Sequence, residues 1–343
     1  MTARPLEEGW ALGPLQVPNR VLLAPLAGIG NWFVRLQAKR YGAGMAVSEM
    51  VSSHAVHHGN ERTLRELLRI DPRERERGPV AIQLFGEDPA VMRSAAAYVA
   101  AREIDAIDIN MGCPVPKVAK TGAGAGMLAD PDRAVAVARA AVEGARAGAG
   151  RAIPVTVKLR SGLRAGDRSG AELAKRLVAE AQVAAIAFHP RSAAVQHKGR
   201  PDYDLAAELV AELPVPVILT GGLSDAGSAR AAFEHTGAAA VMLARGALGN
   251  PWLFAELLGE RSLPPSEGEV LAELDWTIER AVEHLGTERA TRYLRKFYPW
   301  YLARLSLGSS ERKHLQERLQ RGDSLEDVRE ALDPLRTRDP VAA

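Results

Sequence analysis

The stretch Ile107–Pro114 reads IDINMGCP, a short apolar run that ends in a polar residue, a glycine, a cysteine and a proline. Apolar and β-branched residues in a run of this length are typical of a buried parallel strand, and the glycine and proline indicate the loop after it. In barrels and open α/β sheets, the loops at the carboxyl ends of the strands assemble the chemistry. Cys113, the one cysteine of the chain, is therefore either a small buried side chain or a reactive thiol.

Similar apolar runs recur on both sides of this stretch, with helical patterns between most of them. The runs lie at residues 21–25, 45–50, 80–85, 104–110, 153–160, 184–189, 216–220 and 239–243, and the helical patterns at 31–41, 62–69, 89–101, 130–149, 170–182 and 224–234. Roughly eight strands alternating with helices over about 250 residues predict a (β/α)8 TIM barrel. A doubly wound open sheet would carry G-x-G-x-x-G after its first strand, and that motif does not follow Pro25.

The pattern changes after the last of these strands. Residues 263–265 are predicted to be a linker, and Ser266 with Glu269 has the spacing of a capping box that opens a helix. The expected landmarks of the helical part are breaks at Gly286 and near Gly308, a last helix that begins at Ser324, and its end at Pro334. The predicted organisation is a barrel domain over residues 1–259 and a small all-α helical domain over residues 266–338.

The composition excludes several classes of protein. A single cysteine cannot form an intramolecular disulfide, so nothing indicates an oxidising compartment. No apolar run reaches the roughly 18 residues that span a bilayer, and residues 1–9 carry acidic side chains where a signal peptide would have an apolar core. A net charge of +2 is too small to indicate a nucleic-acid-binding protein by itself. We expect a cytoplasmic protein with no membrane association.

Polar residues and glycines stand at nearly every predicted strand end. They are Pro25, Glu49, Gln83, Asn110 with Cys113, Lys158 with Arg160, His189 with Arg191, Gly221 with Gly222, and Ala244 with Arg245. A closed barrel brings its carboxyl strand ends to one mouth, however far apart they are in the sequence. A set that combines cations, amides, an imidazole and a thiol indicates a binding site better than it indicates core packing.

Two features of this set indicate the ligand. Thr220–Gly222 and Ala244–Gly246 end the last two strands, where barrels commonly bind phosphate through backbone N–H groups; the alternative is that these glycines only make tight turns. Lys158, inside a strand, requires the negative charge of a ligand or of Glu49. A phosphate at one end and a cation near a ring system would suit flavin mononucleotide (FMN).

These residues resemble the tRNA-dihydrouridine synthase family, with spacing closest to its bacterial B-type branch. The matching segments are Ala24–Gly28, Ser48–Met50, Asp108–Pro114 with Lys117 and Val118, Lys158–Arg160, His189–Ser192, Gly199–Asp204 and Arg245–Trp252. The run Asn-Met-Gly-Cys-Pro is specific in this setting, whereas many FMN barrels share the glycine motifs. The chain departs from the branch where Thr220-Gly221-Gly222 replaces the usual Asn-Gly-Asp, and where Ala244 and Ala125 replace a glycine and a serine.

The resemblance implies an FMN enzyme that uses NADPH or NADH to reduce the C5–C6 bond of particular tRNA uridines. Hydride passes from flavin N5 to uracil C6, and Cys113 matches the loop cysteine that gives a proton to C5. The implied flavin contacts are Pro25, Leu26 and Ala27 at the ring, Gln83 and Lys158 at its pyrimidine edge, Thr220, Gly221, Gly222, Ala244 and Arg245 at the phosphate, and His189 nearby. The implied RNA contacts in the barrel are Asn110 beside the base, Lys117, Arg160 and Arg191. No metal and no obligate protein partner are implied.

Basic and aromatic residues alternate in the predicted helical domain. They are Arg292, Arg295 and Lys296 among Tyr293, Phe297, Tyr298, Trp300 and Tyr301. A uridine in folded tRNA must be unstacked to meet a flat flavin, which requires cationic contacts to the RNA backbone. The alternative is an amphipathic helix with buried aromatics and solvated arginines, and both descriptions can hold together.

Two other functions fit parts of the same pattern. One is an FMN barrel that acts on a free pyrimidine, such as a dihydroorotate dehydrogenase, although this leaves the helical domain without a role. The other is a tRNA-binding protein whose barrel does not catalyse a reaction. A flavin spectrum distinguishes the second from the leading hypothesis, and turnover without RNA distinguishes the first.

Overall fold

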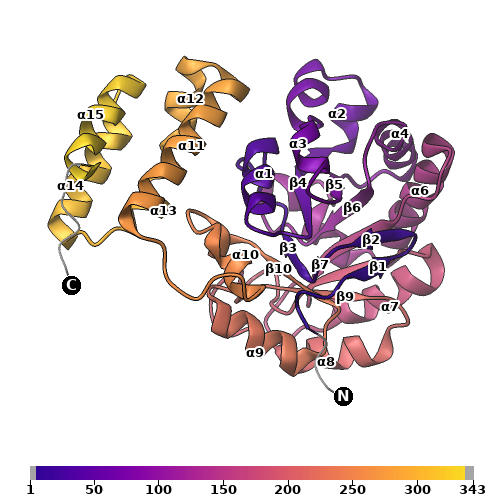
Figure 1. Cartoon of the computed structure of the whole chain (residues 1–343). Coiled ribbons are helices and arrows are strands. Elements are labelled where there is room, and N and C mark those ends of the chain that lie inside the picture. The colour runs from indigo at the N-terminus through magenta and orange to yellow at the C-terminus, as the bar shows by residue number, and fades with distance from the viewer. Residues whose placement is uncertain (1–4, 337–343) are drawn as a thin grey trace. The chain divides into compact units, whose positions relative to one another are not determined.

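The structure, a computed structural model, describes residues 5–336. It contains a closed barrel of eight parallel strands, in which β10 pairs with β3 and completes the ring (Figure 1). The strands are β3 (Val21–Leu23), β4 (Met45–Ser52), β5 (Val80–Phe85), β6 (Ala106–Met111), β7 (Val155–Arg160), β8 (Ala185–His189), β9 (Val217–Thr220) and β10 (Ala240–Leu243). Each predicted strand is present, so the predicted (β/α)8 barrel is confirmed.

Helices follow the strands and lie outside the ring (Figure 1). They are α1 (Trp32–Arg40), α2 (Ser53–His57), η1 (Thr63–Leu67), α3 (Pro72–Arg75), α4 (Pro89–Ala100), α5 (Pro116–Ala119), η2 (Gly124–Ala129), α6 (Pro131–Ala149), α7 (Ser169–Ala181), α8 (Tyr203–Glu212), α9 (Ala226–Thr236), η3 (Arg245–Ala247) and α10 (Trp252–Leu257). The helical patterns in the barrel sequence correspond to α1, η1, α4, α6, α7 and α9. Helix α8 is not among the predicted helices, although Asp202 caps it and Leu205 and Leu209 bury one face.

The inward-facing residues of the strands change character along the barrel axis. At the amino ends they are small and apolar: Ala81, Ala106 and Ala185 belong to one buried cluster. Side chains alternate between the two faces of a strand, so Gln83 shares its face with Ala81, and Asp108 shares its face with Ala106. The barrel therefore has an apolar floor and a polar mouth, and the polar mouth contains the candidate site.

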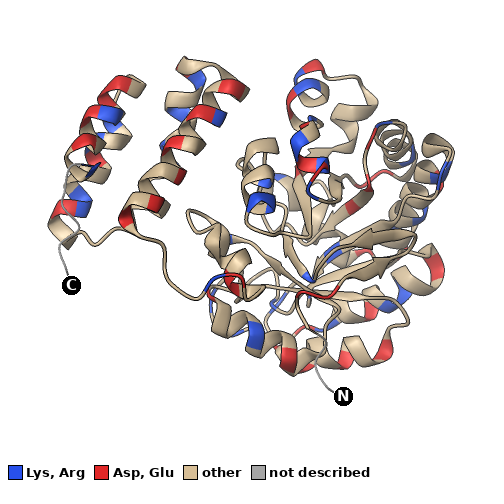
Figure 2. Cartoon of the chain, in the orientation of Figure 1, with Lys and Arg blue, Asp and Glu red and all other residues tan. Residues whose placement is uncertain are grey.

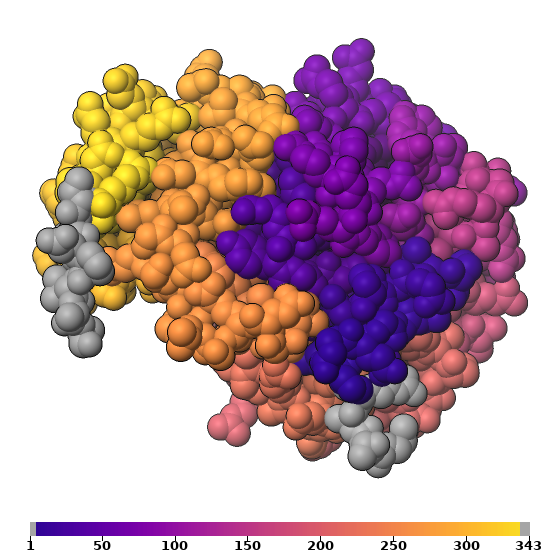
Figure 3. All heavy atoms as spheres, viewed as in Figure 1, coloured from indigo at the N-terminus to yellow at the C-terminus, as the bar shows by residue number. Residues whose placement is uncertain are grey.

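An N-terminal hairpin, absent from the sequence prediction, covers the apolar floor. Strands β1 (Trp10–Leu12) and β2 (Leu15–Val17) pair antiparallel. Trp10, Leu12 and Val17 join the buried cluster of the barrel floor, which removes this end of the barrel from water. In Figure 3 the indigo atoms of the hairpin are flanked by purple and salmon atoms of the barrel.

The chain divides into two compact units. One takes the chain up to Gly246 together with Leu253–Glu260, and the other takes Ala247–Trp252 and the chain from Arg261 onward. The helices of the second unit are α11 (Glu267–Leu285), α12 (Thr287–Leu294), α13 (Tyr298–Leu302), α14 (Ser309–Arg321) and α15 (Leu325–Arg336). Residues 337–338 of the predicted helical domain lie outside the described residues. Across residues 5–336, no helix is both long and apolar enough to cross a lipid bilayer.

The predicted capping box at Ser266 is present, and the predicted end of the last helix is wrong. Ser266 Oγ accepts from Glu269 N at 3.2 Å and Glu269 Oε2 accepts from Ser266 N at 2.8 Å, which completes the capping box. Helix α15, however, continues past Pro334. A proline in the last turn removes only one hydrogen bond of the helix, and the buried side chains of Leu332 and Leu335 hold that turn.

The predicted breaks in the helical unit are also confirmed. Gly286, with a φ of 74°, separates α11 from α12, and Gly308 precedes α14. Ser324 Oγ accepts from Asp327 N at 3.1 Å, which fixes the start of α15. A further break, between α12 and α13, was not predicted; α13 has a proline, Pro299, in its first turn.

Candidate active site

Cys113 lies in the loop after β6, and four hydrogen bonds hold the backbone of that loop. Asn110 Oδ1 accepts from Cys113 N at 2.9 Å and from Gly112 N at 3.1 Å. Cys113 O accepts from Ala125 N at 2.9 Å, and Gly112 O accepts from Arg160 Nε at 3.0 Å. The thiol is free and half-buried. The loop thus combines a fixed backbone with an accessible thiol.

Lys158 stands beside this loop, at the same end of the barrel. It pairs with Asn110 in the register of β6 and β7. Burial and then Arg160 lower the pKa of Lys158 to about 8, whereas Asp108 and Cys113 act in the opposite direction. The amine and the thiol are therefore within electrostatic range of one another. Lys158 is part-exposed in the mouth, and with a pKa of about 8 it is a protonated donor at neutral pH.

The carboxylate that supports Lys158 is Asp108, whereas Glu49, the partner suggested by the sequence, accepts a hydrogen bond from the loop after β3. Asp108 is 2 % exposed. It accepts hydrogen bonds from Thr156 Oγ1 at 2.5 Å and from Gln83 Nε2 at 2.7 Å. Burial raises the pKa of Asp108 to about 6 despite these two bonds and the attraction of Lys158.

This raised pKa predicts a pH-dependent stability. A carboxyl with a raised folded-state pKa stabilises the fold fully below its ordinary value of 3.8, and that contribution is lost as the pH rises through about 6. The loss corresponds to about 3 kcal/mol. We expect the free energy of unfolding of the wild type, measured with urea, to fall by about this amount relative to Asp108→Asn between about pH 4 and pH 7. Parallel pH profiles for the two proteins would contradict this assignment.

Positive groups crowd the side of the mouth formed by β7, β8 and β10. They are Lys158, Arg160, Arg191 and Arg245, and the imidazoles of His189 and His197 lie among them. The His189 and His197 rings stack with centroids 6.3 Å apart. Burial, followed by Lys158, lowers the pKa of His189 to about 2, and burial, followed by Arg245, lowers the pKa of His197 to about 4. Both imidazoles are neutral at pH 7, and the surrounding cations are suited to an anion.

The backbone at the end of β9 lies close against the ring of His189. Gly221 has a φ of 98°, and a Cβ there would lie 2.2 Å from His189 Cδ2, so only glycine fits against the ring. Two buried polar atoms of the neighbouring loop, Arg191 Nε and Ser192 Oγ, have no hydrogen-bond partner among the described residues. Unpaired buried donors beside several cations fit a phosphate group, so the donor set agrees with the phosphate end of FMN.

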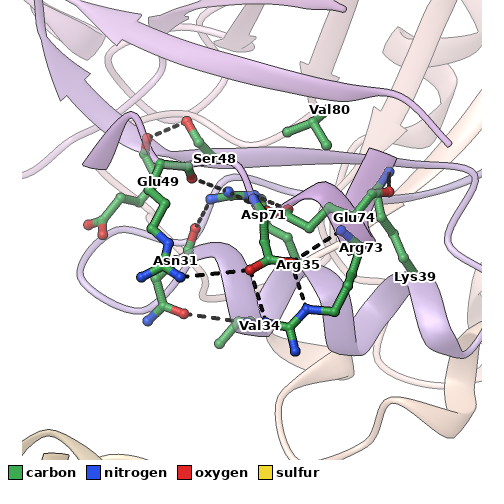
Figure 4. A network of polar contacts seen from close by, with 12 residues as sticks. Asn31, Val34, Arg35, Lys39, Ser48, Glu49, Asp71, Arg73, Glu74 and Val80 are labelled. Atoms are coloured by element: carbon green, nitrogen blue, oxygen red, sulfur yellow. Dashed lines mark hydrogen bonds and ion pairs between the residues drawn. The ribbon is translucent and has the colours of Figure 1, made fainter. Parts of the chain in front are cut away.

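A buried ion pair holds the far end of the loop after β3 (Figure 4). Arg35 donates to Glu74 through Nε at 2.7 Å and through Nη2 at 3.0 Å, and both side chains are buried. Arg35 Nη1 also donates to Gly30 O at 3.0 Å. From the other side, Glu49 Oε2 accepts from Gly28 N at 2.8 Å. The segment Pro25–Ala27, predicted to meet the flavin ring, thus lies in a loop held at its far end.

The whole pattern matches a known family. The family model described as Dihydrouridine synthase matches residues 22–336. The chain belongs to the dihydrouridine synthase family. The match covers the barrel and the described part of the helical unit, and it confirms the resemblance read from the sequence.

Curated relatives of this dihydrouridine synthase family member extend over most of the chain. The tRNA-dihydrouridine synthase B of Pseudomonas aeruginosa is 35% identical over 320 residues, which cover 91% of this chain and 92% of that protein. The probable tRNA-dihydrouridine synthase 1 of Synechocystis is 34% identical over 337 residues, 96% of this chain and 89% of that protein. The probable tRNA-dihydrouridine synthase of Treponema pallidum is 36% identical over 300 residues, 85% of this chain and 86% of that protein.

Solved structures with the same fold are more distant in sequence. Morphinone reductase in complex with tetrahydroNAD superposes with a TM-score of 0.54 at 17% identity, over 78% of this chain and 94% of that chain. A 2-naphthoyl-CoA reductase complex has a TM-score of 0.58 at 15% identity, over 75% of this chain and 52% of that chain. At these identities the similarity shows the barrel fold alone.

Two barrel residues predicted to contact RNA have intramolecular partners in this dihydrouridine synthase family member. Arg160, 4% exposed, donates to Gly112 O and also to Ser192 O at 3.1 Å and Gln196 O at 2.8 Å. It ties the Cys113 loop to the loop after β8. Asn110 uses its amide oxygen for the Cys113 loop. Lys117, by contrast, is exposed on α5.

In the helical unit, basic and acidic residues both occur along the helices (Figure 2). Phe297, Tyr298 and Tyr301 are buried, so the aromatic positions are partly core. Arg292 and Lys296 are exposed one turn apart; Arg292 pairs with Glu288 at 2.9 Å. Lys296 Nζ lies 4.4 Å from the centroid of the Tyr293 ring. Arg295 donates to Gly322 O at 3.1 Å, which gives it a structural contact in its own unit.

Proposed function

We propose that the chain is a tRNA-dihydrouridine synthase that reduces the C5–C6 bond of particular tRNA uridines, with FMN as cofactor and NADPH or NADH as reductant. The observation that carries this proposal is the free, half-buried thiol of Cys113 within electrostatic range of Lys158 at the mouth of the barrel. The names of the curated relatives support the same reaction and a tRNA substrate. A tRNA substrate also supports the cytoplasmic location predicted from the sequence.

The proposed chemistry divides between a cofactor and a protein group. When bound, FMN supplies a hydride from its N5 atom to C6 of the uracil. Cys113 supplies the proton that C5 requires, and the hydrogen bonds of its loop hold the thiol in one place while it does so. Asn110, next to both Cys113 and Lys158, lies beside the base in this proposal.

Lys158 and Gln83 would hold the pyrimidine edge of the flavin. The ammonium of Lys158 would stabilise negative charge at the N1–O2 locus, and desolvation strengthens that interaction. Gln83 is 1% exposed and already bonded to Asp108 and Asn110, so its amide has a fixed orientation and one further hydrogen to donate. Pro25, Leu26 and Ala27 would lie against the ring.

The phosphate of FMN would occupy the positive side of the mouth. Thr220, Gly221, Gly222, Ala244 and Arg245 are the proposed contacts, with His189 beside them. The neutral His189 ring packs on Gly221, which leaves Arg245 and Arg191 to supply charge. Arg191, with its unpaired Nε, can reach either this phosphate or one of the RNA backbone.

Two measurements test the function. The purified protein is expected to show the visible absorption of an oxidised flavin, and NADPH is expected to bleach it. The tRNA of cells without the protein is expected to lack dihydrouridine at one or more positions, which mass spectrometry detects. Adding the purified protein to this tRNA is expected to restore dihydrouridine at those positions. A protein that stays colourless with added FMN, or that reduces free uracil or turns over dihydroorotate without RNA, would contradict the proposal.

The proposed RNA contacts of the helical unit predict a change in salt dependence. Substituting both Arg292 and Lys296 with alanine should weaken tRNA binding and lower the slope of log K against log salt by about one for each phosphate that the variant can no longer bind. Lys175→Ala, on the outer surface of the barrel, should leave the slope unchanged. Fluorescence titrations at several salt concentrations measure both. An unchanged slope in the double variant would show that these two residues do not bind phosphate.

A further inference from the structure

One buried charge in the barrel has no part in the proposed chemistry. Asp108 is 2 % exposed and accepts hydrogen bonds from a hydroxyl, Thr156 Oγ1, and an amide, Gln83 Nε2. A buried carboxylate costs desolvation free energy that an asparagine of the same shape would avoid. Position 108 therefore carries a charge where packing alone does not require one.

A continuous chain of hydrogen bonds links this carboxylate to the candidate acid. Gln83 donates to Asp108 at 2.7 Å, and Gln83 Oε1 accepts from Asn110 Nδ2 at 2.9 Å. Asn110 Oδ1 then accepts from Cys113 N at 2.9 Å and from Gly112 N at 3.1 Å. The chain crosses from β6 to β5 and back, as the register of these strands allows.

The chemistry of the two ends gives this chain one direction. A carboxylate only accepts hydrogen bonds, so Gln83 must present its NH2 group to Asp108 and its oxygen to Asn110. Asn110 must then present its NH2 group to Gln83, which leaves its oxygen for the loop. A backbone N–H only donates, so the far end agrees with the near end. An uncharged residue at position 108 that can donate would also permit the opposite direction, in which the Asn110 NH2 group faces the loop and the N–H groups of Gly112 and Cys113 lose their acceptor.

We infer that Asp108 is a positioning residue whose carboxylate, acting through Gln83 and Asn110, sets the orientation of the loop that carries Cys113. The inference rests on the proposed role of Cys113 as proton donor. The same carboxylate fixes which end of the Gln83 amide faces the mouth. Asp108 itself is not proposed to contact substrate or flavin.

The titration of Asp108 gives the first test. Burial raises its pKa to about 6, opposed by Thr156, Gln83 and the ammonium of Lys158 on β7. A protonated Asp108 can donate, and the chain then has no single direction. The rate of dihydrouridine formation is expected to fall in the wild type as the pH drops through about 6. In Asp108→Asn that fall should disappear. An equal fall in Asp108→Asn would overturn the inference.

A transposed pair of charges gives the sharper test. In Asn110→Asp, a carboxylate meets Gln83 Oε1; if Gln83 turns, its oxygen meets Asp108 instead. One acceptor pair remains in either arrangement. The double variant Asp108→Asn with Asn110→Asp removes the conflict, because Gln83 can turn and donate to residue 110 while the new amide at position 108 donates to Gln83. Asn110→Asp combined with Asp105→Asn, at the opposite end of β6, is the control that leaves the conflict in place.

The readouts are hydrogen exchange of the peptide that contains Gly112 and Cys113, and the rate of dihydrouridine formation. Asn110→Asp is expected to exchange faster and to react at least about tenfold more slowly than wild type. Adding Asp108→Asn should recover about tenfold in rate and most of the protection, whereas adding Asp105→Asn should recover neither. If the losses of rate and protection caused by Asp108→Asn and by Asn110→Asp simply added when both substitutions were combined, the inference would be overturned.

These outcomes separate the inference from the proposed function. If the wild type bound no flavin and formed no dihydrouridine, the proposed function would fail. Hydrogen exchange in the wild type, Asn110→Asp and the two double variants would still report the direction of the hydrogen-bond chain. If the wild type were active but exchange and rate showed no rescue, the proposed function would stand and the role of Asp108 would be rejected.

Discussion

Replacing Cys113 with alanine is expected to lower the rate of dihydrouridine formation by about 10²- to 10⁴-fold, the usual contribution of a positioned general acid. The hydrogen bonds that hold the loop involve the backbone of Cys113, so alanine preserves them. Flavin content, reduction of the flavin by NADPH and tRNA affinity should therefore stay near wild-type values. Single-turnover assays with pre-reduced enzyme measure the affected step alone.

The comparison with Cys113→Ser separates proton donation from packing. Serine keeps the size of the side chain and offers a much weaker acid, so its rate should be close to that of alanine. A serine variant close to wild type would indicate that the side chain only fills space. A wild-type rate in the alanine variant would remove the proton-donor role altogether.

Lys158→Met is expected to cost about 10²- to 10³-fold in flavin reduction or flavin affinity, the scale of losing one preorganised donor at a developing charge. Methionine keeps the unbranched stem and removes the charge. In the wild type, FMN affinity should also fall as the pH rises through about 8, because burial lowers the pKa of Lys158 to that value and only the ammonium binds the N1–O2 locus. Lys158→Met should lose this dependence.

Lys175→Ala, a surface lysine paired with Glu172, is the matched control and should keep wild-type flavin binding at every pH. Flavin fluorescence titrations across the pH range measure both variants. If Lys158→Met bound FMN as tightly as wild type, kept the same pH dependence and was reduced at the same rate, Lys158 would have no contact with the flavin.

The barrel was predictable because a buried parallel strand has an apolar run whatever surrounds it. Val80–Phe85, for example, was predicted with the bounds that the structure has. The three-residue strands Trp10–Leu12 and Leu15–Val17 are too short to show a period, and their stability depends on the barrel floor they cover. The prediction that the helix ends at Pro334 was wrong because a proline in the sequence does not show whether the residues beside it are buried.

The sequence predicted which residues line the site better than it predicted their hydrogen-bond partners. Closure of the barrel brings the strand ends together, so Lys158 and Cys113 could be grouped from the sequence. The partners of Arg160 could not, since its three carbonyl acceptors belong to two loops whose paths only the fold determines. His197 was missed for the same reason. It reaches the cluster through a loop in which Gln196 has a φ of 52°.

In the proposed mechanism, Cys113 and Lys158 serve one flavin. The direct measurement is a crystal structure of the FMN-loaded protein. We expect Lys158 Nζ within about 3 Å of the N1–O2 edge of the flavin, the distance of a charge-assisted hydrogen bond, with Cys113 Sγ facing the space above the same ring where a uracil would stack. A flavin bound elsewhere, or a ring that meets only one of these two side chains, would contradict the account.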